Sequence, residues 1–423
     1  MAPKEREIFH RTFTGLSTDS DSSDEVSRDG DKKVLPKRRQ SHRTTAALMI
    51  VLGAVALWTN GQNILNSLPI PKDRVMRDTT SGPAVPPNAM AACLLLFDDN
   101  LSLVEWLAYN FHTMPLRHVI VLTDPRSKES PVPILERWSN VSLMTWELWD
   151  ETHVFPSPES LQTLRDQGDL VKLHRARQSY FYAQCMRELK LRSKNDNQDE
   201  WVILTDVDEY VTIKPRVSQK GHKLYQPHVN TTLTPPGSIL SFLRQQPKSP
   251  PSCFHMARRD MVSKESSLDE ISVGVPSFMN AQDYFTTRWR HQSHRKITGK
   301  CLVNLAKLHY NDLPIQTPKQ GHIALTGFRC PQIRPKEFYT METTTLVVNH
   351  YLGTKVQYQH RDDPRRDRTN EGFDQKQNQP TTVQDTARSW LEGFVSQVGQ
   401  EQASRLLAGA GSTNVGQQHG TEQ

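Results

Sequence analysis

The stretch from Trp201 to Val211, which reads WVILTDVDEYV, constrains the fold more than any other part of the chain. Its first half is a short continuous apolar run, which is typical of a strand buried on both faces of a sheet. Three carboxylates then follow within four residues, at Asp206, Asp208 and Glu209. Because ligands bind at the carboxyl ends of strands in open α/β sheets, this pattern predicts a functional site directly after a buried strand.

The carboxylate pair Asp206 and Asp208 points to a metal ion. Two carboxylates one residue apart repel each other unless a cation joins them. Hard oxygen ligands of this kind suit Mg²⁺ or Mn²⁺, and such ions usually also bind substrate phosphates. We therefore predict a metal that binds a nucleotide diphosphate. The alternative interpretation is a solvated acidic turn, because Asp-x-Asp is common by chance.

Strand and helix patterns alternate from Ala91 up to the acidic stretch. In order, we expect a strand at 91–97, a helix with Asn100 as its N-cap, a strand at 117–122, a helix at 133–138, a strand at 141–149 and a helix at 169–191. This alternation predicts an α/β fold with a doubly wound, mostly parallel sheet and right-handed crossovers. Such a sheet offers a nucleotide-binding crevice at the carboxyl ends of its strands.

The second half of the chain is less regular. We expect a short helix near Ser238 and strands at 253–262, 300–308 and 345–350, the last ending on His350. The core domain then spans 91–358 and is followed by a charged linker at 359–381, a helical segment at 382–410 that docks on the domain, and a polar tail at 411–423.

The N-terminal ninety residues predict a membrane anchor. Residues 1–43 are polar, end in a basic cluster and predict a disordered cytosolic tail, whereas residues 44–64 carry no charge. Since a membrane helix needs about 20 residues and basic flanks stay cytosolic, we predict a single-pass type II anchor with the remainder in the lumen. A cleaved signal peptide is the competing interpretation, but the apolar run lies far from the N-terminus. Residues 65–90 hold five prolines and predict an extended stem.

Four motifs in this order resemble glycosyltransferase family 92, and most closely its algal and diatom members. They are DDNLSLVEWLAYNF, RHVIVLTDPRS, WVILTDVDEYV and NHYLGT, within Ala91 to Gly353, and WLEGFV near the C-terminus resembles the algal members too. The resemblance implies a GT-A-like, Rossmann-like domain that uses a nucleotide-diphosphate sugar, with Asp206 and Asp208 as its Asp-x-Asp motif. The chain has Asp98-Asp99 where animal members have Asn-Glu, so the donor nucleotide stays open.

Further site residues follow from these two lines of argument. His350 is the third predicted metal ligand, with a satisfied core histidine as the alternative. Asp124, Arg126 and Ser127 follow the second strand, where GT-A enzymes bind the base or ribose of the donor; an ordinary Asp-Pro turn is the alternative. Gln178 shares one face of the long helix with His174 and Arg177, and we predict that it contacts the donor, with a solvated helix face as the alternative.

A catalytic base and additional cations are expected in the second half. Inverting transfer needs a carboxylate base near the acceptor hydroxyl, and we choose Asp283 over Glu265, Asp269 and Glu270. One or two basic residues there are expected to meet the diphosphate; the candidates are Arg258, Arg259, Arg288, Arg290 and Lys296.

The sequence thus predicts a Mn²⁺- or Mg²⁺-dependent glycosyltransferase of the Golgi membrane that acts on a glycan or glycoprotein. The alternative is an inactive lumenal carbohydrate-binding or scaffold protein with the same fold. A different phosphoryl enzyme would want a P-loop, which the chain lacks. The net charge is +6, but no Lys/Arg block is interleaved with aromatic residues, so we expect no nucleic-acid partner.

Cysteines and sequons give two expectations about the lumenal part. All five cysteines follow the anchor, and we predict pairing among Cys253, Cys301 and Cys330, with one left over and with Cys93 and Cys185 as unpaired core residues. The sequons at Asn140 and Asn230 fit surface glycans, whereas Asn100 is expected to stay bare.

Overall fold

The computed structural model describes the greater part of the chain between Pro86 and residue 410. The described residues are 86, 88–193, 199–213, 235–245, 252–263, 275–287, 289–292, 300–314, 345–353, 358, 360, 373–375, 381–383 and 390–410. All of them belong to one compact unit, Met76–Gln423. The predicted tail, anchor and most of the stem lie outside these residues, and none of the described helices is long and apolar enough to cross a bilayer.

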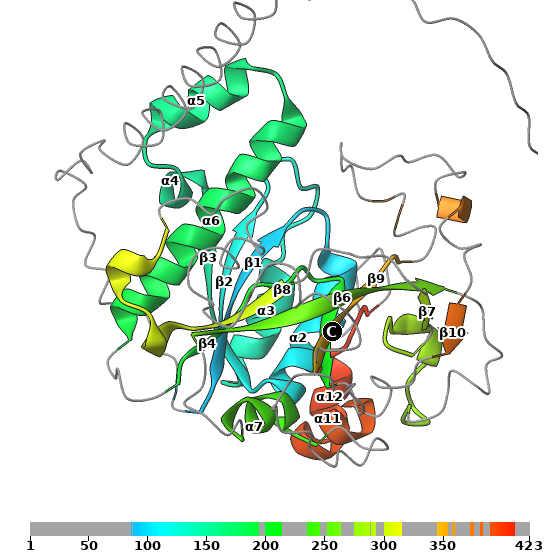
Figure 1. The fold of residues 1–423 in the computed structure, drawn as a ribbon. Helices are drawn as coiled ribbons and strands as arrows, with labels where there is room; N and C mark the ends of the chain where they lie inside the picture. The colour runs from blue at the N-terminus through cyan, green and yellow to red at the C-terminus, as the bar shows by residue number, and fades with distance from the viewer. Residues whose placement is uncertain are drawn as a thin grey trace, which may run out of the picture. The chain divides into compact units, whose positions relative to one another are not determined.

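The strands of the described residues form one ten-stranded sheet (Figure 1). At one end the strands run in the order β3-β2-β1-β4 and are all parallel to one another. Their bounds are β1 Met90–Leu96, β2 Leu116–Thr123, β3 Thr145–Trp149 and β4 Trp201–Ile203. The α/β class and the four strands predicted up to the acidic stretch are therefore confirmed, although β3 is shorter than expected.

Beyond β4 the sheet is mixed, so the predicted parallel arrangement holds for only part of it. β8 is antiparallel to β4 and β6, β5 is antiparallel to β9, and β9 is parallel to β6. β7 is antiparallel to both β6 and β10. Bounds are β5 Glu209–Ile213, β6 Cys253–Ser263, β7 Trp289–Gln292, β8 Lys300–Asn304, β9 Leu346–Tyr351 and β10 Thr381–Val383. Parallel neighbours need a long crossover, usually a helix, and three helical crossovers join the first four strands.

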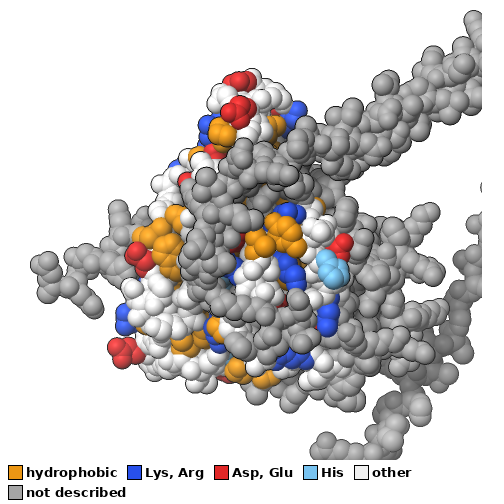
Figure 2. Space-filling view, turned by 90° about the vertical axis from the view of Figure 1, so that its left-hand side faces the viewer, with side chains coloured by type: hydrophobic (Ala, Val, Ile, Leu, Met, Phe, Trp, Pro, Cys, Tyr) orange, Lys and Arg blue, Asp and Glu red, His pale blue; other side chains and the backbone are white. Residues whose placement is uncertain are grey.

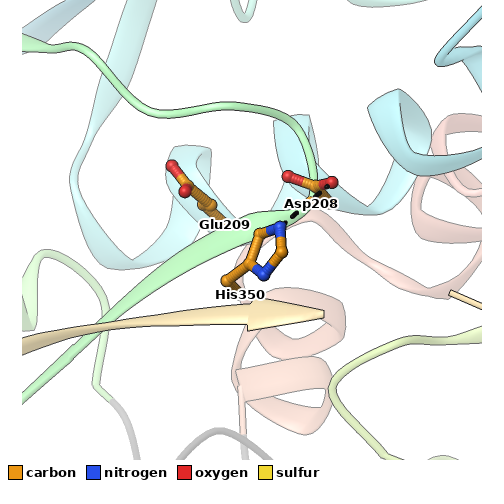
Figure 3. Close-up of side chains that lie close together, drawn as sticks. All are labelled: Asp208, Glu209 and His350. Carbon is orange, nitrogen blue, oxygen red and sulfur yellow. Dashed lines mark ion pairs between the residues drawn. The ribbon is translucent and has the colours of Figure 1, made fainter. Parts of the chain in front are cut away.

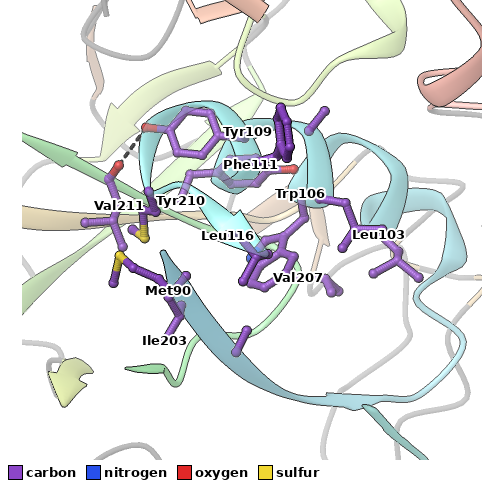
Figure 4. Close-up of a cluster of buried hydrophobic side chains, with 14 of the residues drawn as sticks. Met90, Leu103, Trp106, Tyr109, Phe111, Leu116, Ile203, Val207, Tyr210 and Val211 are labelled. Atoms are coloured by element: carbon purple, nitrogen blue, oxygen red, sulfur yellow. Dashed lines mark hydrogen bonds between the residues drawn. The ribbon is translucent and has the colours of Figure 1, made fainter. Parts of the chain in front are cut away.

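Two helical layers cover the parallel strands, which confirms the doubly wound arrangement. Alternate residues of β1 face opposite layers: Leu94 packs in the core cluster that holds Trp106 of α2, and Leu95 in the cluster that holds Phe181 of α6. Figure 4 shows the first cluster, where the hydroxyl of Tyr109 donates a hydrogen bond to the Val211 carbonyl at 2.6 Å. The helices here are α2 Asn100–Thr113, α3 Val132–Ser139, α4 Glu151–Val154, α5 Pro158–Asp166 and α6 Leu170–Arg192.

Helix starts were predicted with mixed success. The carboxylate of Asp169 accepts a hydrogen bond from the Lys172 amide and caps α6 where the sequence placed its start. Asn100, predicted as the N-cap of α2, is instead its first helical residue. Its amide group donates to the Ser130 carbonyl, so a contact with a distant loop replaces the local cap.

The C-terminal helical segment packs on the domain, as predicted, but as two helices. Gly399, with φ of 85°, separates α11 (Trp390–Val398) from α12 (Gln400–Leu406). Trp390 is fully buried, and its ring lies 5.5 Å from that of Tyr109 on α2. The remaining short elements are α7 Ser238–Arg244, η2 Ala281–Asp283, η3 Leu305–Lys307 and η4 Tyr310–Asp312.

The disulfide prediction is wrong for two of the five cysteines. Cys93 on β1 and Cys185 on α6 are fully buried, as expected, but they form a disulfide with their Cα atoms 6.1 Å apart. The bond follows from packing, because α6 crosses the face of the sheet to which Cys93 points. Cys253 is also disulfide-bonded, to a partner outside the described residues, and Cys301 is a free buried thiol.

Candidate functional site

The acidic stretch forms a tight turn between β4 and β5. The Asp206 amide donates to the carboxylate of Glu209 at 3.0 Å, and the Glu209 amide donates to the Asp206 carbonyl at 3.0 Å. Val207 points into the core and anchors the turn. The turn therefore holds Asp206 and Asp208 at the carboxyl end of β4, where the sequence placed them.

Strand register brings two further side chains to this turn. Glu209 on β5 lies directly opposite His350 on β9, and His350 lies directly opposite Asp260 on β6. Residues opposite each other on neighbouring strands project to the same face of a sheet. Glu209, His350 and Asp260 thus form one row across three strands that are far apart in sequence.

His350 lies between two carboxylates. Its Nδ1 is 2.9 Å from Oδ1 of Asp260, and its Nε2 is 3.6 Å from Oδ2 of Asp208 (Figure 3). A carboxylate that accepts the Nδ1 proton leaves the lone pair of Nε2 directed at whatever lies beyond, which is the arrangement found at metal-binding histidines. The hydrogen bond and charge of His350 outweigh the effect of burial and lower the pKa of Asp260.

A second cation network lies on the other side of the turn. The ammonium of Lys300 is 3.1 Å from Oδ2 of Asp206 and 2.9 Å from Oε2 of Glu209. The guanidinium of Arg258 lies 3.6 Å from Oε1 of Glu209 and 3.5 Å from Asp260. Burial raises the pKa of the Glu209 carboxyl, and the charge of Lys300 only partly offsets this effect.

The donor set fits a divalent cation. Asp208, Glu209 and His350 each offer one ligand atom, and these atoms lie within 4.8 Å of one another. The four carboxylates of the turn and row face two fixed cations, which leaves excess negative charge unless His350 is protonated. Mixed oxygen and imidazole ligands suit Mn²⁺ better than Mg²⁺, which prefers oxygen alone. Among these three, Glu209 is the weakest candidate because Lys300 and Arg258 already face its carboxylate.

Tyr182 of α6 is a site residue that the sequence did not reveal. The residue is fully buried. Burial, together with the charges of Asp206, Glu209 and Asp208, holds the pKa of its hydroxyl far above the usual value. Lys300 and Asp260 were missed as well, although a lysine in the apolar strand KCLVN is a signal that could have been followed.

The predicted donor-binding residues gather at the end of the neighbouring strand β2. The Asp124 carboxylate accepts two hydrogen bonds from the Arg126 guanidinium, at 3.0 and 2.9 Å, and one from Arg177 at 3.1 Å. His174 lies 3.4 Å away. Asp124 is fully buried, yet hydrogen bonds from His174 and Arg126 and the charge of Arg177 outweigh burial and hold its pKa well below the usual range. Its oxygens are therefore already bound by the protein, whereas Arg126 is 27% exposed.

Ser127 and Gln178 border this cluster. The hydroxyl of Ser127 accepts a hydrogen bond from the amide of Asp98 at 3.3 Å, and Gln178 is buried on α6 beside Arg177. Asp98 has a left-handed backbone, with φ of 53°, and its Oδ1 accepts from the Lys128 amide at 2.6 Å. Its Oδ2 is buried and has no hydrogen-bond partner among the described residues.

The two clusters lie at the same edge of the parallel strands. Asp124 follows β2 and Asp206 follows β4, and β1 separates these strands, so their ends lie roughly 10 Å apart. Arg177 and Tyr182 reach the two clusters from one helix, five residues and roughly 7–8 Å apart along its axis. The sheet therefore brings together residues that the sequence could assign only to separate motifs.

Asp283 lies in η2, where its carboxylate accepts a hydrogen bond from Asn280 at 3.2 Å. The buried carboxylate of Glu105 accepts from the amides of Phe285 and Thr286, at 2.5 and 3.0 Å, and so ties this turn to α2. No contact among the described residues joins Asp283 to the Asp208–His350 pair. Several predicted candidates lie outside the residues or side chains described: Glu265, Asp269, Glu270, Arg288, Arg290, Lys296 and Asn230.

On the face drawn in Figure 2, Lys and Arg side chains occur at several separate places among apolar and neutral groups. Comparison of the chain with protein-family models and with curated proteins gave no match.

Proposed function

We propose that this chain is a metal-dependent glycosyltransferase that moves a sugar from a nucleotide-diphosphate sugar to a glycan or glycoprotein acceptor. One observation carries the proposal: His350 lies between Asp208 and Asp260, beside the acidic turn at the carboxyl end of a parallel strand. The strand order β3-β2-β1-β4 is that of nucleotide-binding halves of Rossmann folds and supports a GT-A-like assignment. The resemblance to family 92 favours the same chemistry.

The proposed roles follow from charge and position. Asp208 and His350 hold Mn²⁺, and Asp260 keeps the proton of the imidazole on Nδ1. The bound ion supplies charge that neutralises the leaving nucleotide diphosphate. Arg126, at the end of β2, offers a partly exposed guanidinium to the rest of the donor.

We assign the base of an inverting reaction to Asp283, which lies in the half of the chain that follows the donor-binding strands. Replacing Asp283 with Asn should abolish transfer and leave the affinity for Mn²⁺ unchanged. The proposal includes a Golgi location, with residues 44–64 as the type II anchor and the sheet domain in the lumen.

The test is a hydrolysis and transfer screen of the full chain with a panel of nucleotide sugars, in the presence of Mn²⁺ and after its removal with EDTA. We expect release of the nucleotide diphosphate from one donor, only with metal. Binding of sugars or nucleotides without metal-dependent release from any donor would refute transfer and favour a carbohydrate-binding protein.

A further inference from the structure

Lys300 is a fully buried lysine at the start of β8, and its side chain is 1% exposed. Its ammonium contacts two carboxylates of the acidic turn, Asp206 at 3.1 Å and Glu209 at 2.9 Å. A charged side chain that is this deeply buried is held in place by its ion partners, because leaving it unpaired is very costly. Lys300 is therefore a fixed positive charge inside the proposed metal site.

This charge divides the carboxylates of the turn into two groups. Asp206 and Glu209 share the ammonium of Lys300, and Glu209 also accepts the Asp206 amide. Figure 3 shows the Glu209 carboxylate extending away from the Asp208 carboxylate, which pairs with His350. A metal ion that used Asp206 or Glu209 would have to displace the ammonium of Lys300 or lie close to it, at a Coulomb cost.

We infer that Lys300 is a positioning residue that withholds Asp206 and Glu209 from the metal. The ion is then bound by Asp208 and His350, and its remaining positions stay open for the phosphate oxygens of the donor. Ions held by one or two protein carboxylates plus substrate phosphates are the usual pattern for nucleotide sites. Metal binding by the free protein is consequently weak and is completed by the donor. The inference rests on the metal-dependent function proposed above.

The test measures Mn²⁺ binding to the full chain without any donor, by calorimetric titration and by the loss of the free-ion EPR signal. Lys300→Met should raise Mn²⁺ affinity at least about tenfold, because a nearby positive charge is lost and Asp206 is released. Asp206→Asn alone should change the affinity less than about threefold, whereas added to Lys300→Met it should abolish the gain. A lysine with a merely structural role would not increase metal affinity when removed.

Two further variants guard the interpretation. Lys307→Met removes an exposed lysine just after β8 and controls for the change in net charge. If Lys300→Met fails to fold because Glu209 is left buried and unpaired, Lys300→Met with Glu209→Gln removes both charges and still releases Asp206. That double variant should keep the gain in affinity, and Lys300→Arg should retain the wild-type affinity.

The outcomes separate this inference from the proposed function. Mn²⁺ binding by the wild type without any gain in the Lys300 variants would overturn the inference and leave the function standing. A gain in the variants with no binding by the wild type, even with donor, would support the inference and overturn the function. If neither the wild type nor the variants bind Mn²⁺, both are overturned.

Discussion

Nδ1 of His350 lies 2.9 Å from Oδ1 of Asp260, its direct neighbour across the parallel pair of β9 and β6. This contact fixes which nitrogen of the imidazole faces Asp208. It also predicts a measurable role for Asp260, which need not touch the metal itself.

Replacing Asp260 with Ala should weaken Mn²⁺ binding by roughly 10–100-fold, as is usual when the partner of a metal-binding histidine is removed. The free side of the ring would then no longer be held in one tautomer. Asp260→Asn keeps an acceptor oxygen and should restore part of the affinity. Equal losses for both variants would show that charge, and not the hydrogen bond to His350, is what matters.

Asp208→Asn should lower metal-dependent transfer by at least about 100-fold, because an oriented charge at the site is lost. Stability should stay level or rise, since a carboxylate near other carboxylates is neutralised. His350→Ala should weaken metal binding less, because water can replace a neutral ligand. Thermal unfolding and steady-state kinetics provide the measurements, with the exposed Asp166→Asn as a matched control. Wild-type transfer by Asp208→Asn would end the metal interpretation.

The Cys93–Cys185 disulfide should contribute substantially to stability. It closes a loop with a sequence separation of 92, for which loss of the cross-link costs about 4 kcal/mol in the chain-entropy account. The double variant with Cys93→Ala and Cys185→Ala should therefore unfold at clearly lower urea than the wild type. Cys301→Ala, which removes a buried free thiol and no cross-link, is the control. Peptide mapping without reductant should recover Cys93 linked to Cys185, and finding both as thiols would contradict the structure.

His118 should make stability depend on pH between about 6.5 and 4. It is buried on β2, with Nδ1 2.8 Å from Thr145, and burial lowers its pKa to about 4 although Glu147 opposes the shift. As pH falls through this window, the unfolded chain takes up a proton that the folded protein refuses. The free energy of unfolding should then fall by on the order of 2–3 kcal/mol, whereas it is fully retained above pH 6.5.

His118→Gln should remove this part of the pH dependence, as measured by urea unfolding at a series of pH values. The exposed His309→Gln is the matched control, because solvent surrounds that side chain in both states. Parallel stability curves for the wild type and His118→Gln from pH 6.5 to 4 would disprove the assignment.

Glycosylation offers a test of the predicted lumenal location. Asn140 is exposed at the end of α3, whereas Asn100 is 6% exposed and its amide group donates to the Ser130 carbonyl at 3.0 Å. In cells that express the full chain, Asn140→Gln should therefore remove one glycan and Asn100→Gln none, as seen by mobility shift with and without glycosidase. A chain without glycan at Asn140 would contradict either its exposure or its compartment.

Local sequence was sufficient for the parallel strands, the long helix α6 and the placement of Asp206 and Asp208 at a strand end. Continuous apolar runs and helical spacing are properties of neighbouring residues, so they can be read directly along the chain. The same local reasoning failed for the N-cap of α2, because Asn100 found its partner in a loop thirty positions away.

The sequence by itself determined that a buried strand ends in an acidic turn and that α6 covers the sheet. Only the tertiary structure decided that His350 and Asp260 lie beside that turn, that Lys300 occupies two of its carboxylates, and that Cys93 bonds to Cys185. The reason is physical. These relationships depend on the register of β9 against β5 and β6, on the pairing of β8 with β4, and on the line along which α6 crosses β1. Each is set by how long-range apolar surfaces pack, and no local pattern of residues encodes it.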